Sequence, residues 1–401
     1  MSNMNRRKFL ELNSLAAGGF LAPGLFSNVV SAQPANNDHI LVVVELSGGN
    51  DGLNSVVPYA DDAYYRHRPN ISIKEQDLLK LDDHYGFNPG MLGFERLWHT
   101  GDLAIIHGCG YENPSYSHFT SMAYWHTAAP NSGNEFGWIG RIADTMTPTT
   151  APNTLIGIGN TQSLAVKSRV HTPVVFDDPD RFQRNGFIQT REALNHIDTR
   201  QAETTNATRK FLNDVALGAR KSSSSVREAW NNYKTPIDYG IAPLDLPKVA
   251  ACISHGLPTR LYHVAFRNNA FDTHVQQPAL HRRLLSYACD GIHGFVRDVE
   301  RLGLEDRVTL LVYSEFGRRV PENSNLGTDH GSANVMFMIG NQVNGGHYGE
   351  QPSLTELVDG DNLQHTTDFR QVYATAIEDW LELDASKEVL NGEFDTLPIF
   401  G

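Results

Sequence analysis

Cysteine is scarce in this sequence, which has only Cys109, Cys252 and Cys289 among its 401 residues. An odd and low number of cysteines excludes the multiple-disulfide framework that is typical of small secreted domains. A single bridge would still be compatible with an oxidising compartment. The fold must therefore rest mainly on a buried core, and the chain is long enough to form one.

Basic residues are outnumbered as well. The chain has 33 lysines and arginines against 46 aspartates and glutamates, which gives a net charge of −13. Nucleic-acid binding depends largely on positive side chains that neutralise phosphates. The charge balance therefore argues against a nucleic-acid partner.

No stretch of the sequence is long and apolar enough for a membrane-spanning helix, which needs about 20 mostly apolar residues. The nearest candidate, Leu15–Ala22, is short, contains two glycines and is followed by Pro23. This pattern favours a cleaved export signal over a membrane anchor. We therefore expect no stable membrane span in the mature chain.

The N-terminal segment has the three parts of such a signal. Arg6 and Arg7 form a twin-arginine pair ahead of the apolar stretch, and Val30–Ala32 offers the small residues that a signal peptidase needs. We expect residues 1–32 to be a twin-arginine signal peptide. The twin-arginine export machinery would then deliver residues 33–401, already folded, to the periplasm or the extracellular space.

Hydrophobic patterning of the remaining residues predicts an α/β protein. Short apolar runs predict strands at 39–46, 103–107, 259–266, 308–313 and 334–339, and apolar bursts predict further strands between 152 and 176. Apolar residues at helical spacing predict helices at 117–128, 278–302 and 368–383. Because strands alternate with helices, we expect a mostly parallel central sheet with helices on both faces.

One region departs from this alternation. Residues 199–234 are polar but keep a helical spacing, and the Ser222–Ser225 tract within them is typical of an exposed loop or a helix start. We expect this region to belong to a cap inserted at about 152–247.

Carboxylates and histidines gather in the loops next to the predicted strands. These loops contain Asp51, Ser117 with His118, Asp272 with His274, Glu315, and Asp329 with His330. Any one of them alone is more typical of a turn or a helix cap. At a common edge of the sheet they would form the oxygen and nitrogen ligand set of Zn²⁺ or Mn²⁺. Two such ions could hold the attacking and leaving oxygens of a displacement at phosphorus.

The segments that carry these residues resemble a bacterial family called domain of unknown function 1501. The resemblance rests on the motifs at 46–54, 117–119, 271–274, 314–318 and 327–331, and it covers essentially the whole mature chain. That family is grouped by similarity with the alkaline phosphatase superfamily, which includes phosphatases, sulfatases and cofactor-independent phosphoglycerate mutases. The resemblance implies an alkaline-phosphatase-like three-layer sandwich.

The resemblance also implies a role for each residue. Asp51 matches the first metal-ligand aspartate of the superfamily, and Ser117 matches its nucleophile. Asp272 and His274 resemble the pair that shares one metal, Glu315 the next acidic ligand, and His330 the last histidine. It further implies a divalent metal cofactor, zinc first, with manganese, magnesium or calcium also compatible, as one or two ions.

Two departures from the superfamily pattern weaken the second metal site. Glu315 is followed by Phe316 where the superfamily has Asp-His, and Asp272 and His274 are closer in sequence than usual. One site, formed by Asp272, His274 and His330, is therefore better supported. The other has Asp51 and Glu315 and lacks a histidine, a gap that His118 or Asp329 would fill. A sulfatase is further disfavoured, because no Cys/Ser-x-Pro-x-Arg motif is present.

These residues lead to two functional hypotheses. The first is an exported metal-dependent hydrolase of phosphate or related sulfate esters, small or polymeric, in which Ser117 attacks and Arg318 or Arg319 stabilises the anionic oxygens. The second is a diverged relative without catalysis that binds a ligand or a protein outside the cell. In that case Ser117 is a helix N-cap and the two arginines form a solvated surface pair. Other histidines, such as His263, are scattered and more typical of structural roles.

Overall fold

The central strand of the fold is β1, Ile40–Leu46, and all seven of its residues are buried. The computed structural model describes residues 38–146, 153–182 and 207–401, so the predicted signal peptide lies outside the described residues. Alternate side chains of β1 enter two different cores, with Val42 and Val44 on one face and Leu41 and Val43 on the other. A strand that is covered on both faces can be apolar throughout, as this one nearly is.

The main sheet has nine strands within the described residues, in the order β11-β5-β10-β9-β1-β8-β6-β7, with β12 also paired to β5. The other strands are β5 Leu103–Gly110, β6 Leu155–Ile158, β7 Val174–Phe176, β8 Leu261–Phe266, β9 Val308–Tyr313, β10 Asn334–Ile339, β11 Gly346–Tyr348 and β12 Thr367–Asp368. Only β10 among them runs antiparallel to its neighbours, which are β5 and β9. The predicted mostly parallel sheet is confirmed, and the strands predicted at 308–313 and 334–339 have the expected ends.

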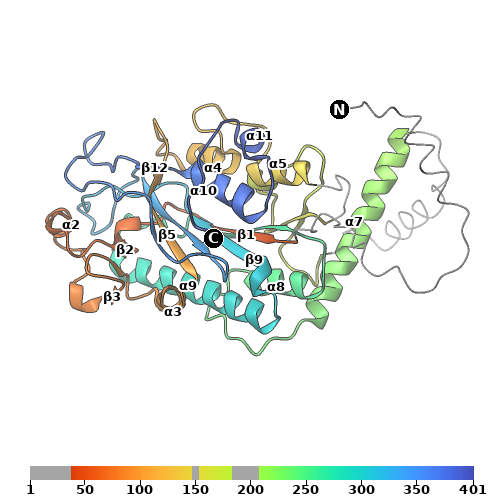
Figure 1. The fold of residues 1–401 in the computed structure, drawn as a ribbon, viewed down its shortest axis with the longest axis horizontal. Helices are drawn as coiled ribbons and strands as arrows, with labels where there is room; N and C mark the ends of the chain where they lie inside the picture. The colour runs from red at the N-terminus through yellow and green to blue at the C-terminus, as the bar shows by residue number, and fades with distance from the viewer. Residues whose placement is uncertain (1–37, 147–152, 183–206) are drawn as a thin grey trace, which may run out of the picture. The chain divides into compact units, whose positions relative to one another are not determined.

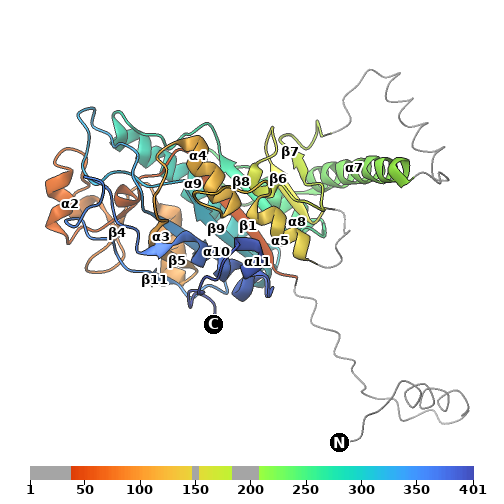
Figure 2. The same cartoon turned by 90° about the horizontal axis from the view of Figure 1, so that it is seen from above.

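Helices cover both faces of the sheet and form the three layers that the sequence predicted (Figure 1). One face carries α3 Leu92–Thr100, α8 Leu246–Ser254 and α9 Gln277–Arg301. The other carries α4 His118–Thr127, α5 Trp138–Thr145, α10 Phe369–Thr375 and α11 Ser386–Leu390, which lie over the sheet in Figure 2. The closing helix expected at 368–383 is interrupted, since a π-helical segment, Ala376–Trp380, follows α10.

A smaller unit lies beside the carboxyl edge of β1. It contains the helix α2 Asp62–His67 and a three-stranded antiparallel sheet of β2 Val56–Val57, β4 Gly86–Phe87 and β3 Leu79–Lys80. Short 3-10 turns at Gly52–Asn54, Glu75–Asp77, Leu164–Val166 and Glu305–Arg307 complete the connections. The turn Gly52–Asn54 links this unit directly to the loop that follows β1.

Two features of the structure lie within the region predicted as a cap. Strands β6 and β7 belong to the main sheet, because β6 pairs with both β8 and β7. Ser222–Ser225 lies inside the helix α7, Ala207–Asn232, and not in a loop. The tract tolerates a helix because Ser223 Oγ donates to the carbonyl of Arg220 at 3.0 Å and because Val226 gives α7 a buried face. Among the described residues, no helix is both long and apolar enough to cross a bilayer.

Candidate functional site

The site lies at the carboxyl edge of the parallel strands, where the loops after β1, β8 and β9 meet. His330 precedes β10, so in a parallel strand it would have been at the opposite edge. Because β10 is antiparallel to β9, its first residue, Asn334, lies at the same edge as the carboxyl ends of β1 and β9. The reversed strand therefore brings His330 to the other predicted residues.

Asp272 is at the centre of the cluster. Its Oδ1 lies 3.0 Å from Nε2 of His274 and 3.1 Å from Nε2 of His330, and its Oδ2 lies 3.4 Å from Nε2 of His118. The Nε2 atoms of His274 and His330 are 2.9 Å apart. The ligand atoms of His118, Asp272 and His330 thus all lie within 4.8 Å of one another, and Nε2 of His274 lies next to those of Asp272 and His330.

Each imidazole is oriented through its other nitrogen. His330 Nδ1 donates to the carbonyl of Tyr116 at 2.7 Å, and His118 Nδ1 lies 2.8 Å from Glu315 Oε1. His274 Nδ1 lies 3.2 Å from Asp329 Oδ1. Oxygen partners at Nδ1 favour the proton there and leave the lone pair of Nε2 facing the cluster, as in metal-binding histidines.

The donor set fits a divalent cation. Tetrahedral zinc with bonds of about 2.0–2.1 Å requires ligand atoms about 3.3 Å apart, and each of the three Nε2 atoms lies 3.0–3.4 Å from one or the other carboxylate oxygen of Asp272. In addition, Nε2 of His118 is buried and has no hydrogen-bond partner among the described residues. A buried polar atom without a partner is costly, and a cation at this position would satisfy it.

The electrostatics keep Asp272 ionised. Burial raises the pKa of Asp272, but hydrogen bonds from His330 and Arg318 outweigh it and hold the pKa well below the usual range. The hydrogen bond to Glu315 raises the pKa of His118 above its ordinary value. The cluster therefore contains a carboxylate at neutral pH, which is the form that binds a cation.

Glu315 contacts His118 on the side that faces away from the cluster. Its carboxylate is fully buried and accepts hydrogen bonds from the backbone N–H groups of Gly48 at 2.8 Å and Gly49 at 3.0 Å. Gly48 has a φ of +119°, and a Cβ there would lie 2.6 Å from the backbone nitrogen of Asp272. Glu315 thus orients His118 and holds the loop after β1, whose Gly48 packs closely against the backbone of Asp272.

Asp51 is separated from this cluster by its own partners. Its Oδ2 accepts from Arg68 Nη1 at 2.7 Å and from Gln277 Nε2 at 2.6 Å, and neither Asp51 nor Arg68 has any exposed surface. Burial raises the pKa of Asp51, but the charge of Arg68 lowers it below the ordinary value. The structure therefore places Asp51 in a buried ion pair. No motif in the sequence pointed to Arg68.

Arg318 and Arg319 have different environments. Arg318 is buried and donates to the carbonyls of Gly49 and Thr328 and, at 2.8 Å, to Asp272 Oδ1. It is thus neither a solvated surface residue nor free to bind a substrate, and it positions Asp272. The side chain of Arg319 is 42% exposed and pairs with Asp361 at 3.6 Å.

Ser117 is the N-cap residue of α4, directly before His118. Its side chain forms no capping hydrogen bond, and among the described residues its hydroxyl has no hydrogen-bond partner. The residue is exposed. The position is that of a cap, but the hydroxyl is not used for capping, and the residue directly precedes His118 of the cluster.

Among the three comparisons with known proteins, the one with curated proteins gave no match. Several solved structures are similar in fold only. A sulfatase, PsFucS1 from Pseudoalteromonas sp., is 11% identical with a TM-score of 0.41, over 90% of this chain and 71% of that one. An alkaline phosphatase superfamily protein from Vibrio parahaemolyticus is 9% identical with a TM-score of 0.38, over 87% of this chain and 72% of that one.

A third similar structure is the C-terminal periplasmic domain of EcEptC from Escherichia coli, in complex with Zn. It is 11% identical with a TM-score of 0.35, over 77% of this chain and 74% of that one. The family described as "Protein of unknown function (DUF1501)" matches residues 38–392. This match spans nearly all of the described residues and agrees with the motifs in the sequence, so the chain belongs to the DUF1501 family.

Proposed function

We propose that this protein is a metal-dependent hydrolase of phosphate or related sulfate esters, with Ser117 as its nucleophile. The observation that supports this most directly is that the ligand atoms of His118, Asp272 and His330 lie within 4.8 Å of one another, next in the chain to Ser117, which is exposed and forms no capping bond. Nε2 of His118 has only a 3.4 Å contact with Asp272 Oδ2 and forms no hydrogen bond among the described residues, which leaves it available to a cation.

The residues would divide the work as follows. His118, Asp272, His274 and His330 would hold one divalent ion, and their mixed nitrogen and oxygen set suits zinc best. A cation held there would favour the alkoxide of Ser117 and the negative charge of the substrate oxygens. Ser117 also lies at the N-terminus of α4, a helix of 10 residues, whose dipole favours an anion at that end.

Arg319 supports an anionic substrate. Its guanidinium is close enough to Tyr116 and Asp329 to influence their pKa values, so it lies near the histidine cluster, and its side chain is partly exposed. An arginine can donate two parallel hydrogen bonds to a phosphate or sulfate group. Because Ser117 is exposed, the substrate would be either a small ester or a polymer.

The proposal includes export through the twin-arginine machinery to the periplasm or the extracellular space. It rests on Arg6 and Arg7, the apolar stretch and the cleavage site in the sequence. Cleavage after Ala32 would produce the mature chain.

One observation favours the alternative, a relative that binds a ligand or a protein without catalysis. Asp51 and Glu315, the predicted ligands of a second ion, are both occupied by internal hydrogen bonds. The described residues therefore provide a site for a single ion at this edge of the sheet, and a single ion is compatible with a purely structural role.

The test measures metal content and turnover in the same preparations. The protein, purified without chelator or polyhistidine tag, is compared with Ser117→Ala, with an Asp272→Ala/His330→Ala double variant and with Thr120→Ala, an exposed position on the same helix. We expect the wild type and both single variants to hold about one equivalent more zinc or manganese than the double variant. Phosphate and sulfate ester turnover should fall about a thousand-fold or more in Ser117→Ala, which keeps its metal, should fall in the double variant as well, and should be unchanged in Thr120→Ala.

Absence of metal from every preparation, even after reconstitution, would refute the metal site. Metal without turnover of any ester, or turnover that Ser117→Ala leaves unchanged, would refute the serine mechanism. Bound metal without turnover of any ester would favour the alternative function, a binding protein without catalysis.

A further inference from the structure

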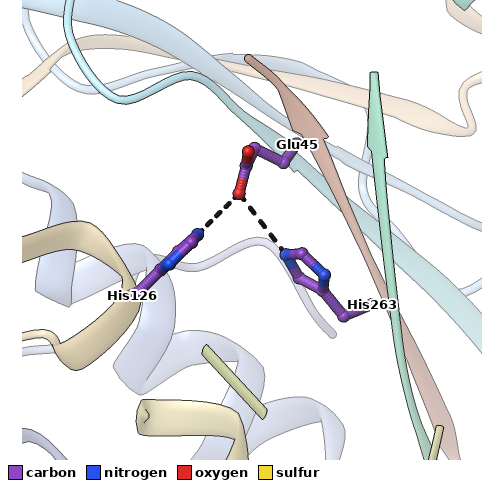
Figure 3. Close-up of side chains that lie close together, drawn as sticks. All are labelled: Glu45, His126 and His263. Atoms are coloured by element: carbon purple, nitrogen blue, oxygen red, sulfur yellow. Dashed lines mark hydrogen bonds and ion pairs between the residues drawn. The ribbon is translucent and has the colours of Figure 1, made fainter. Parts of the chain in front are cut away.

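A second group of ligand-type side chains lies within the sheet and α4. Glu45 is the one charged residue of β1, and its side chain points to the face that α4 covers (Figure 3). His263 comes from the neighbouring strand β8, and His126 from the last turn of α4. All three residues are buried. A charge placed in a strand that is otherwise apolar is costly unless it is paired or binds a metal.

The three side chains meet at one carboxylate oxygen. Glu45 Oε2 lies 2.6 Å from Nε2 of His126 and 3.5 Å from Nε2 of His263, and it accepts a hydrogen bond of 3.0 Å from the hydroxyl of Tyr313. The ligand atoms of Glu45, His126 and His263 all lie within 4.8 Å of one another. Nε2 of His263 is buried and has no hydrogen-bond partner among the described residues.

The group opens to a cavity of about 340 Å³. Polar atoms from the loops after β6 and β8 line it, including those of Asn160, Thr161, Arg267 and Asn268. A cavity of this size admits water or a small polar molecule to the histidines. The three side chains thus lie at the wall of a cavity, and a water or small molecule in this cavity could serve as a further metal ligand.

We propose that Glu45, His126 and His263 form a second site for a divalent transition metal, separate from the Asp272 cluster, with an open coordination position that faces this cavity. Two histidines and one carboxylate are the protein ligands of open zinc sites and of non-haem iron(II) sites. Formation of the site requires the 2.6 Å separation between His126 and Glu45 to widen to about 3.3 Å. The cation would replace the long 3.5 Å contact between Nε2 of His263 and Glu45 Oε2 with a direct bond to that nitrogen.

Glu45 accepts bonds from His126 and Tyr313, so an ion pair without metal is the competing explanation. The two explanations differ in what happens when zinc or iron(II) is supplied. An ion pair binds neither, whereas the site should take up about one equivalent of one of them. Iron(II) is supplied without oxygen, and each metal is tested alone.

The experiment starts from the Asp272→Ala/His330→Ala variant, so that the first cluster does not contribute. Glu45→Gln, His263→Ala and, as a control, His255→Ala are added to it separately. His255 is an exposed residue that ends α8. Bound metal is measured by elemental mass spectrometry after gel filtration. Cobalt(II) is used as a spectroscopic probe, because its visible absorption reports on coordination by nitrogen and oxygen. Folding is followed by circular dichroism.

We expect about one equivalent of zinc or iron(II) in the starting variant and the His255→Ala control. Glu45→Gln and His263→Ala should lower the affinity at least 100-fold while circular dichroism is unchanged. If His263→Ala fails to fold, the Glu45→Gln result decides, since glutamine keeps the size of the side chain. No metal in the starting variant, or unchanged affinity in the folded Glu45→Gln protein, would overturn the proposal. Because no ester turnover is measured, the result does not depend on the function proposed for Ser117.

Discussion

Replacing Asp51 by asparagine should lower the free energy of unfolding by about 3–5 kcal/mol, because it leaves the charge of Arg68 buried without its carboxylate. The two side chains are fully buried and joined at 2.7 Å. At an effective dielectric constant of about 20, two unit charges about 4 Å apart attract each other by about 4 kcal/mol. This attraction is of the same size as the expected loss.

Two further hydrogen bonds keep the guanidinium of Arg68 from reaching solvent in the variant. Its Nε donates to the carbonyl of Val320 at 2.8 Å and its Nη2 to the carbonyl of Arg319 at 3.0 Å, so the smaller unit and the loop after β9 hold it in place. These bonds keep the guanidinium buried, so the unpaired charge lowers the free energy of unfolding of the variant.

The assay is urea unfolding followed by tryptophan fluorescence. With a slope of about 3 kcal/mol/M, the midpoint should fall by about 1–2 M. Asp62→Asn, at an exposed position nearby, should change stability by less than about 0.5 kcal/mol. The double variant Asp51→Asn/Arg68→Met removes both charges and should regain part of the loss. A variant Asp51→Asn that keeps its midpoint and loses bound metal would refute this reasoning and make Asp51 a ligand.

Three further predictions concern the site and the core. Glu315→Gln removes the charge that orients an imidazole of the cluster and should weaken metal binding about 10–100-fold. The affinity is measured by chelator competition, and an unchanged affinity would contradict the supporting role of Glu315. Gly48→Ala places a Cβ 2.6 Å from the backbone nitrogen of Asp272 and should also reduce metal content. Gly101→Ala, with a similar positive φ and no atom nearby, should leave metal content unchanged, and equal effects would exclude the steric explanation. Burial raises the pKa of Asp298, but hydrogen bonds from two tyrosines outweigh this effect and lower the pKa below the ordinary value. The ionised form of Asp298 therefore stabilises the fold above about pH 4. This contribution to the free energy of unfolding is lost as the pH falls. Asp298→Asn should therefore have a lower urea midpoint than the wild type at pH 7, and the difference should shrink as the pH is lowered below about 4; a difference that does not shrink would refute the assignment.

Much of the architecture follows from local patterns in the sequence. A strand such as 308–313 is visible because its residues are apolar and β-branched, and both of its faces are buried in the structure. The order of the strands is a different matter, since β1 pairs with β8 and β9, far away in the chain. The reversal of β10 was not predicted, although the position of His330 depends on it.

The site residues illustrate the same limit. Asp272, His274 and His330 were grouped from motifs, and the structure brings them together with His118. Asp51 had the same appearance in the sequence, yet it is paired with Arg68. Ion pairing depends on which side chain of another loop arrives nearby, and no periodic pattern encodes that. Glu45 did leave a signal, a charge inside an otherwise apolar strand.

The reversed direction of β10 has a consequence for the order in which the protein matures. Tyr116 and His330 are hydrogen-bonded although 214 positions separate them in the chain. During synthesis, the loop that carries Tyr116 is complete long before His330 has left the ribosome. A nascent chain or a fragment that ends before His330 therefore lacks a ligand, however well its first strands have folded. Tight cation binding by the Asp272 cluster would mark completed molecules and distinguish them from truncated ones before any export takes place.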